Sequence, residues 1–165
     1  MDASGTDVGR LFVERARYIL REEYGPRLRR CLQEMTEEDL WWRPSERCNS
    51  AGNLVLHVCG NARQWIIAGL GAAPDARRRA DEFAERGPVP RAELEARLND
   101  TLHEVDAMLA ALDPARLAEP KTIQGFAVNP LQAVFHVVEH FGQHLGQVIY
   151  LTKMRRDLDL RFYNL

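Results

Sequence analysis

Four long stretches of this 165-residue chain carry apolar residues at helical spacing, and the alternating runs typical of strands are almost absent. The stretches cover about residues 8–35, 49–70, 91–112 and 129–155. Each such helix has an apolar stripe that must be buried, and packing the four together buries all of them. The sequence therefore predicts an all-α fold, an antiparallel four-helix bundle. A chain of this length usually builds one core, so residues 1–165 are expected to form a single domain.

Residues that cap or break helices mark the bounds of these stretches. Gly25-Pro26 is expected to kink or interrupt the first, because proline lacks a backbone donor and clashes with the preceding turn. Gly71 is expected to stop the second, and the fourth should begin near Asn129-Pro130. The candidate N-caps are Thr6 or Asp7 for the first stretch and Asn49 or Ser50 for the second.

The connections between the helices are expected to be long loops. In the segment TEEDLWWRPSERCNS, which is rich in turn residues, Trp41 and Trp42 should fold back onto the core. A loop containing several prolines and glycines precedes the third helix. In TIQGFAVNP, Gly125 lies between two short β-prone runs and allows a small hairpin before the last helix.

Charge and composition exclude some functions. The net charge of -2 gives no electrostatic footprint for duplex binding, so nucleic acid is not an expected partner. Arg77, Arg78 and Arg79 are interpreted as part of a solvated face or loop. No run approaches the roughly 20 apolar residues that span a bilayer, and the first residues do not resemble a secretion signal. With three cysteines and no CxxC pair, a cytoplasmic protein without membrane contact is expected.

A polar line follows the second stretch, which is otherwise apolar. Asn53, His57, Asn61 and Gln64 are spaced by four, four and three residues and so share one side of a helix. If this side is buried, each group must be hydrogen-bonded or ligated, because an unsatisfied buried polar group costs about 1–3 kcal/mol. If it faces solvent, there is no site.

Three histidines recur every four residues in HVVEHFGQHLGQ of the fourth stretch. Imidazoles at i and i+4 lie about one turn apart, close enough to ligate one ion. His136 and His144 are about 12 Å apart along the axis, at roughly 1.5 Å per residue, so one ion cannot take all three. Spacing leaves His136/His140 and His140/His144 open as the ligand pair. The expected third ligand is His57.

Other polar residues near these histidines receive weaker predictions. Gln143 and Gln147 are expected to hold ligand imidazoles through the second ring nitrogen. Glu139 is expected to point away from the ion, and His103, which has charged neighbours, to be exposed. Spacing identifies no catalytic residue.

Two segments resemble a known family: SAGNLVLHVCGNARQWIIAGLG and HVVEHFGQHLGQVIYLTKMRRDLDLRFYNL. They are similar to the DinB-like superfamily, which includes the YfiT-like proteins, and within it to a branch of bacterial proteins without an assigned reaction. The resemblance implies a four-helix bundle, often dimeric, with three histidines that hold a divalent metal near one end.

Position by position, the resemblance implies His57, His140 and His144 as the metal ligands. Phe141 and Leu145 occupy positions that are often polar in relatives, so the resemblance does not extend to a substrate pocket. The residues then expected to support the ligands or pack beside them are His136, Asn53, Asn61, Gln64, Gln143 and Gln147.

Three neutral imidazoles leave positions open on a divalent ion, as in catalytic zinc sites. Zinc or nickel is the expected ion, with iron a further candidate. Some characterised proteins that this chain resembles use such a site for thiol-dependent transfer or isomerisation with a low-molecular-weight thiol. Others look like metal-dependent hydrolases. The resemblance thus implies a metal-dependent enzyme with a small-molecule substrate, working as a homodimer. The alternatives are a non-catalytic metal-binding or stress-related protein and a plain dimeric helical bundle with packed histidines.

Overall fold

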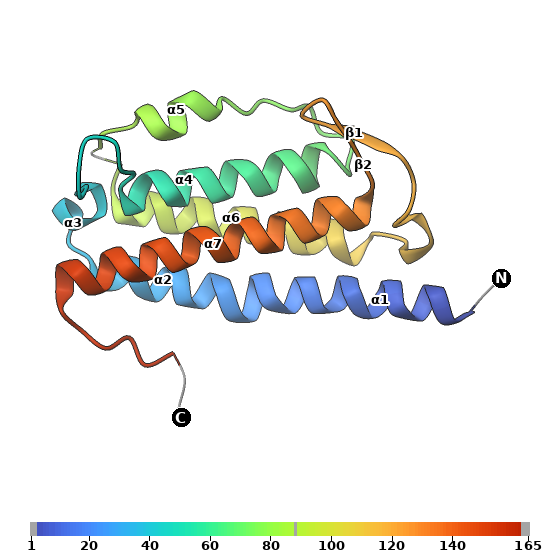
Figure 1. Ribbon diagram of the computed structural model, residues 1–165, viewed down its shortest axis with the longest axis horizontal. Helices are drawn as coiled ribbons and strands as arrows, with labels where there is room; N and C mark the ends of the chain where they lie inside the picture. The colour runs from blue at the N-terminus through green and yellow to red at the C-terminus, as the bar shows by residue number, and fades with distance from the viewer. Residues whose placement is uncertain (1–2, 88, 163–165) are drawn as a thin grey trace.

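Four long helical segments pack side by side in the computed structural model, which describes residues 3–87 and 89–162 (Figure 1). The first has three consecutive parts, α1 (Ala3–Tyr18), the π-helical η1 (Ile19–Tyr24) and α2 (Gly25–Glu34). The others are α4 (Ala51–Ala62) with its π-helical extension η2 (Arg63–Ala68), α6 (Arg91–Ala110) and α7 (Pro130–Arg156). The shorter elements are α3 (Glu37–Trp41), α5 (Arg79–Ala84), the 3-10 turn η3 (Pro114–Arg116) and strands β1 (Lys121–Ile123) and β2 (Phe126–Val128). The predicted all-α fold is confirmed.

A long crossover connection sets the directions of these helices. Residues 69–90 run back along the bundle, so α4 and α6 point the same way, while α1–α2 and α7 point the opposite way (Figure 1). The packed pairs α4–α7 and α2–α6 are antiparallel. Natural four-helix bundles include versions with one or two such crossovers. Here the crossover carries α5 along the outer side of α4.

The first helix absorbs its proline without a break. Gly25-Pro26 was expected to kink or interrupt it, but the segment before them widens into the π-helix of η1. The Gly25 N–H donates to the carbonyl of Leu20, five residues back. A wider turn at this point gives the proline ring room that an α-helical turn would not, so the helix continues into α2.

The predicted helix starts are partly right. Ser50 caps α4, as expected, with its side chain accepting from the N–H of Asn53. Thr6 and Asp7 do not cap the first helix, because the backbone is already helical from Ala3 and both residues lie inside α1. The remaining bounds agree with the prediction to within two residues.

Two segments expected to be loops contain short helices, α3 and α5. The start of α3 is a capping box, in which the Thr36 hydroxyl accepts from the Asp39 N–H and the Asp39 carboxylate accepts from the Thr36 N–H. Trp41 packs against the core as predicted and donates from Nε1 to the carbonyl of Val89, at 3.1 Å. The predicted hairpin forms between β1 and β2.

The core lies between the four long helical segments. Its largest fully buried side chains include Leu32, Val55, Ile66, Leu98 and Phe141, which come from all of these segments. Burying a side chain of this size contributes about 1.5–3 kcal/mol. None of the described helices is both long enough and apolar enough to span a membrane.

Asp39 joins α3 to the end of α7. Its side chain is 4% exposed and accepts from Arg155 Nε at 2.6 Å and from Arg156 Nη1 at 3.4 Å. Burial alone would raise the pKa of Asp39, but hydrogen bonds from Arg155 and Thr36 outweigh burial and hold the pKa below its ordinary value. The carboxylate is therefore ionised at neutral pH and fastens the C-terminal end of α7.

Replacing this carboxylate should destabilise the protein in a pH-dependent way. We expect Asp39→Asn to cost about 2 kcal/mol at pH 7, because hydrogen bonds to charged groups contribute about that much. Since the folded-state pKa is lowered, the wild-type advantage should be full above the ordinary value of 3.8 and shrink as pH falls through the lowered pKa. Urea unfolding across this range measures the difference. Asp81→Asn, at a site 60% exposed, is the control and should change stability by less than about 0.5 kcal/mol.

Candidate metal centre

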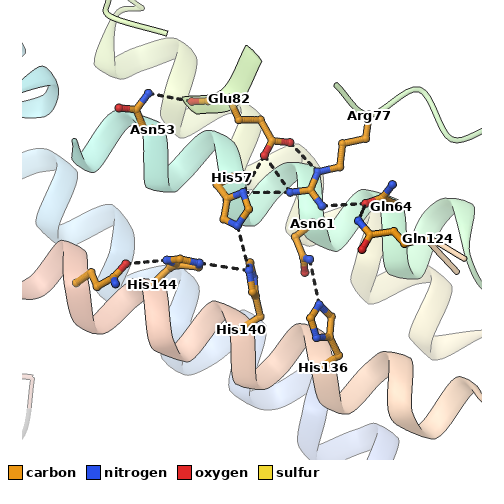
Figure 2. A network of polar contacts seen from close by, with 11 residues as sticks. Asn53, His57, Asn61, Gln64, Arg77, Glu82, Gln124, His136, His140 and His144 are labelled. Atoms are coloured by element: carbon orange, nitrogen blue, oxygen red, sulfur yellow. Dashed lines mark hydrogen bonds and ion pairs between the residues drawn. The ribbon is translucent and has the colours of Figure 1, made fainter. Parts of the chain in front are cut away.

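Three imidazoles from α4 and α7 converge in the groove between these helices (Figure 2). His57 Nε2 lies 3.1 Å from His140 Nε2, and His144 Nε2 lies 3.2 Å from the same atom. Ligand atoms of the three residues all lie within 4.8 Å of one another. Nitrogens bound to one tetrahedral zinc at about 2.0–2.1 Å are separated by about 3.3–3.4 Å. The three-histidine group can therefore hold a metal ion.

His136 lies outside this group. Its Nε2 is 3.1 Å from Asn61 Nδ2, and its ring packs on Trp65 with the centroids 4.1 Å apart. Of the two pairs that spacing left open, the structure thus brings His140 and His144 next to His57. His136 and Asn61 pair beside the group, as residues expected to pack there, without contacting an Nε2 atom of the three.

The other ring nitrogens of two histidines have partners that can accept a hydrogen bond. His57 Nδ1 lies 2.8 Å from Glu82 Oε2, and His144 Nδ1 lies 2.8 Å from Gln147 Oε1. A carboxylate can only accept, so the Nδ1 of His57 carries the proton when it donates to Glu82. Its Nε2 then has a free lone pair directed towards His140. Metal-bound histidines in proteins have this arrangement.

The cluster favours neutral imidazoles. Burial, together with the nearby His144 and His57, lowers the pKa of His140 to about 3. Burial also lowers the pKa of His144, although the hydrogen bond to Gln147 opposes this. Both rings are therefore unprotonated at neutral pH, which is the state that binds a metal.

Sequence reasoning missed two charged residues of the crossover, Arg77 and Glu82. Arg77 was interpreted as part of a solvated run, and this was wrong: its side chain is 5% exposed and that of Glu82 is 11% exposed. Arg77 Nε donates to Glu82 Oε1 at 2.7 Å, and its Nη2 donates to Oε2 at 2.9 Å. Its neighbour Arg78 is 84% exposed, as expected. The crossover folds over α4 and buries one arginine of the run (Figure 2).

Glu82 remains ionised next to His57. Burial alone would raise its pKa, but the hydrogen bonds with Arg77 and His57 outweigh burial, and the pKa is lowered. Space for this carboxylate comes from Gly60, one turn after His57 on α4. A Cβ at Gly60 would overlap the Glu82 carboxylate and approach Arg77 Nε to 3.1 Å. A glycine within an apolar helix was a sequence signal for such a close approach.

The residues of this site all lie in the part of the chain that matches a known protein family. The profile of the DinB superfamily matches residues 22–148, which is more than half of the chain. The chain belongs to the DinB superfamily. No curated protein matches it. This DinB-superfamily assignment agrees with the resemblance of the second and fourth helices.

The amides expected around the ligands have different roles in this DinB-superfamily chain. Gln147 contacts His144, as predicted. Gln143 does not hold an imidazole, since it is exposed and donates to Glu139 Oε1 at 3.1 Å. Gln64 accepts from Arg77 Nη1 at 2.9 Å and so reaches the histidines only through Arg77. The spacing in the sequence predicted the side of the helix on which Gln64 lies. It could not predict that Arg77 of the crossover would be its partner.

Asn53 anchors the crossover and does not contact an imidazole. Its Nδ2 donates to the carbonyls of Glu82 and Glu85, both at 2.9 Å, and its Oδ1 accepts from Arg43 Nη2 at 3.0 Å. Asn53 is fully buried. The first residue of the predicted polar line thus fixes α5 over His57. The exposed His103 and Glu139 lie where they were expected, at the surface.

Removing the Asn53 amide should release the crossover. We expect Asn53→Ala to cost about 1–3 kcal/mol, because the Glu82 carbonyl loses its Asn53 donor, whereas the Glu85 carbonyl keeps donors from Arg43 and Arg86. Cleavage by a protease should become faster within residues 69–90 and stay unchanged elsewhere. Limited proteolysis with mass spectrometry, together with urea unfolding, measures both effects. Asn99→Ala is the control, because Asn99 is exposed; equal cleavage of the two variants would contradict this role.

Proposed function

We propose that this protein binds one divalent metal ion through His57, His140 and His144. The observation that supports this most is the convergence of three Nε2 atoms, two of them 3.1 and 3.2 Å from the third. One imidazole N–H can bridge a pair of such nitrogens, but it cannot satisfy three lone pairs that face one point. A cation at that point can. Zinc or nickel suits an all-nitrogen set, as does iron.

We further propose that the bound ion serves catalysis on a small molecule. Three protein ligands leave a coordination position for water or a thiolate, and the ion lowers the pKa of either. A cavity of about 570 Å³ lies beside the site, and Gln147 and Leu54 are among its lining residues. Gln147 holds His144, and Leu54 lies one turn from His57. Cavities of about 300–1,000 Å³ accept small ligands.

A second cavity, of about 680 Å³, lies between α4, the crossover and α6. Arg77 and Glu82 line it, so it approaches His57 from the side of Nδ1. The smaller cavity is lined by Gln147, which holds His144, and by Leu54 on α4, and we infer that it serves substrate binding better. Thiol-dependent transfer or isomerisation is the proposed reaction class, and ester or amide hydrolysis is the alternative on the same site.

Metal content tests the binding proposal. Untagged protein purified without added metal should contain close to one ion per chain by elemental analysis. His57→Ala combined with His140→Ala should abolish binding, because it removes two of three ligands. His144→Ala should also lose most of the metal.

His136→Ala is the matched control on the same helix, and it should retain the metal because His136 pairs with Asn61. If His136→Ala loses metal and His144→Ala keeps it, the ligand set is wrong. If wild-type protein is metal-free and also fails to bind zinc or nickel on titration, the histidines are packing residues of a plain helical bundle.

Turnover tests the catalytic proposal. Metal-loaded protein should accelerate either transfer to a low-molecular-weight thiol or hydrolysis of activated esters, and chelation should remove at least about 90% of the rate because the nucleophile needs the ion. Readdition of zinc or nickel should restore it. The His136→Ala variant, which also lacks a histidine of α7 but keeps its metal, is the control for the ligand variants. Comparison with it separates loss of metal from loss of fold. A protein that binds metal but accelerates neither reaction would favour a metal-binding role without catalysis.

A further inference from the structure

His57 Nδ1 has two polar neighbours with opposite hydrogen-bonding character. Glu82 Oε2, an acceptor, lies 2.8 Å away, and Arg77 Nη2, a donor, lies 3.1 Å away (Figure 2). A neutral imidazole has one nitrogen with a proton and one without. Nδ1 can therefore serve Glu82 as a donor or Arg77 as an acceptor, but one state excludes the other.

The choice determines whether His57 can bind a metal. If Nδ1 donates to Glu82, Nε2 has its lone pair free towards His140. If Nδ1 accepts from Arg77, the proton moves to Nε2, and that nitrogen cannot ligate an ion until it is removed. All three side chains are at least nearly buried, with exposures of 5% for His57, 5% for Arg77 and 11% for Glu82. Water is thus largely excluded as an alternative partner.

We propose that Glu82 is a positioning residue that selects the Nδ1-protonated tautomer of His57 against the competing donor Arg77. The inference deepens the proposed metal site, and its effect on affinity rests on that function. The tautomer itself is a property of the metal-free protein. Arg77 has a double role: it orients the Glu82 carboxylate through two hydrogen bonds, and it would capture Nδ1 if the carboxylate were removed.

Zinc affinity of three variants tests this balance, measured by competition with a chromophoric chelator. Glu82→Gln should weaken binding about 10–100-fold, the usual effect of losing such a partner. Arg77→Met loses the two hydrogen bonds that orient Glu82, but the carboxylate still accepts from Nδ1. This variant should therefore bind zinc as tightly as wild type or more tightly, because the competing donor and a nearby positive charge are gone. The double variant should bind more tightly than Glu82→Gln alone, since the amide oxygen introduced at position 82 is then free to accept from Nδ1.

Opposite effects separate selection of the tautomer from support of the fold. Each single substitution breaks the same Arg77–Glu82 ion pair, so a purely structural role predicts that both weaken zinc binding alike. Urea unfolding of the metal-free proteins reports that shared loss of stability. Gly60→Ala offers a test without a change of polar residue. It should displace the carboxylate and weaken zinc binding, although alanine is the better helix former.

The ¹⁵N chemical shifts of the His57 ring measure the tautomer directly, in protein kept metal-free with a chelator. Wild type and Arg77→Met should be protonated on Nδ1, and Glu82→Gln on Nε2. An unchanged tautomer in Glu82→Gln, or equal loss of affinity in both single variants, would overturn the inference. If wild-type protein binds no zinc, the metal proposal fails, but these shifts still decide the tautomer.

Discussion

The packing of α4 against α7 is the constraint on which the site depends. It places His57 of α4 opposite His140 and His144 of α7. His140 contacts both His57 and His144 through one nitrogen. Burial keeps the His140 and His144 rings neutral. At these distances the lone pairs of two unprotonated nitrogens repel each other, unless a proton or a cation lies between them. Helix packing thus brings these nitrogens to a spacing at which a proton or a cation can bridge them.

The fold and the three histidines could be predicted because both follow from local periodicity. Helical spacing gave the long helices, and spacing of four gave the histidines on α7 one common side. The choice between His136 and His144 needed the rotation of α7 about its own axis, which tertiary packing sets. The His136 ring packs on Trp65 and pairs with Asn61 instead of with His57. The DinB resemblance supplied this information where spacing could not.

The residues that hold His57 could not be predicted for a different physical reason. Arg77 and Glu82 lie in a connection whose composition is typical of solvated loops, and their burial results from where the connection travels. A short link of roughly two to six residues would have made α4 and α6 antiparallel and left α4 uncovered. The long crossover instead runs over α4, and Asn53 ties it down at the carbonyls of Glu82 and Glu85. Pattern describes a helix face, but not the distant segment that will cover it.

The crossover and the proposed ion must influence each other if both act on His57. Glu82 holds the imidazole from the outer side of α4, while an ion would hold it from the groove. By thermodynamic linkage, whatever free energy the docked crossover adds to metal binding, the bound metal adds equally to docking of the crossover. Metal would therefore slow cleavage within residues 69–90, and it would do so less in a protein whose Glu82 no longer reaches His57. The segment that sequence alone assigns to a loop is, in this arrangement, part of the site.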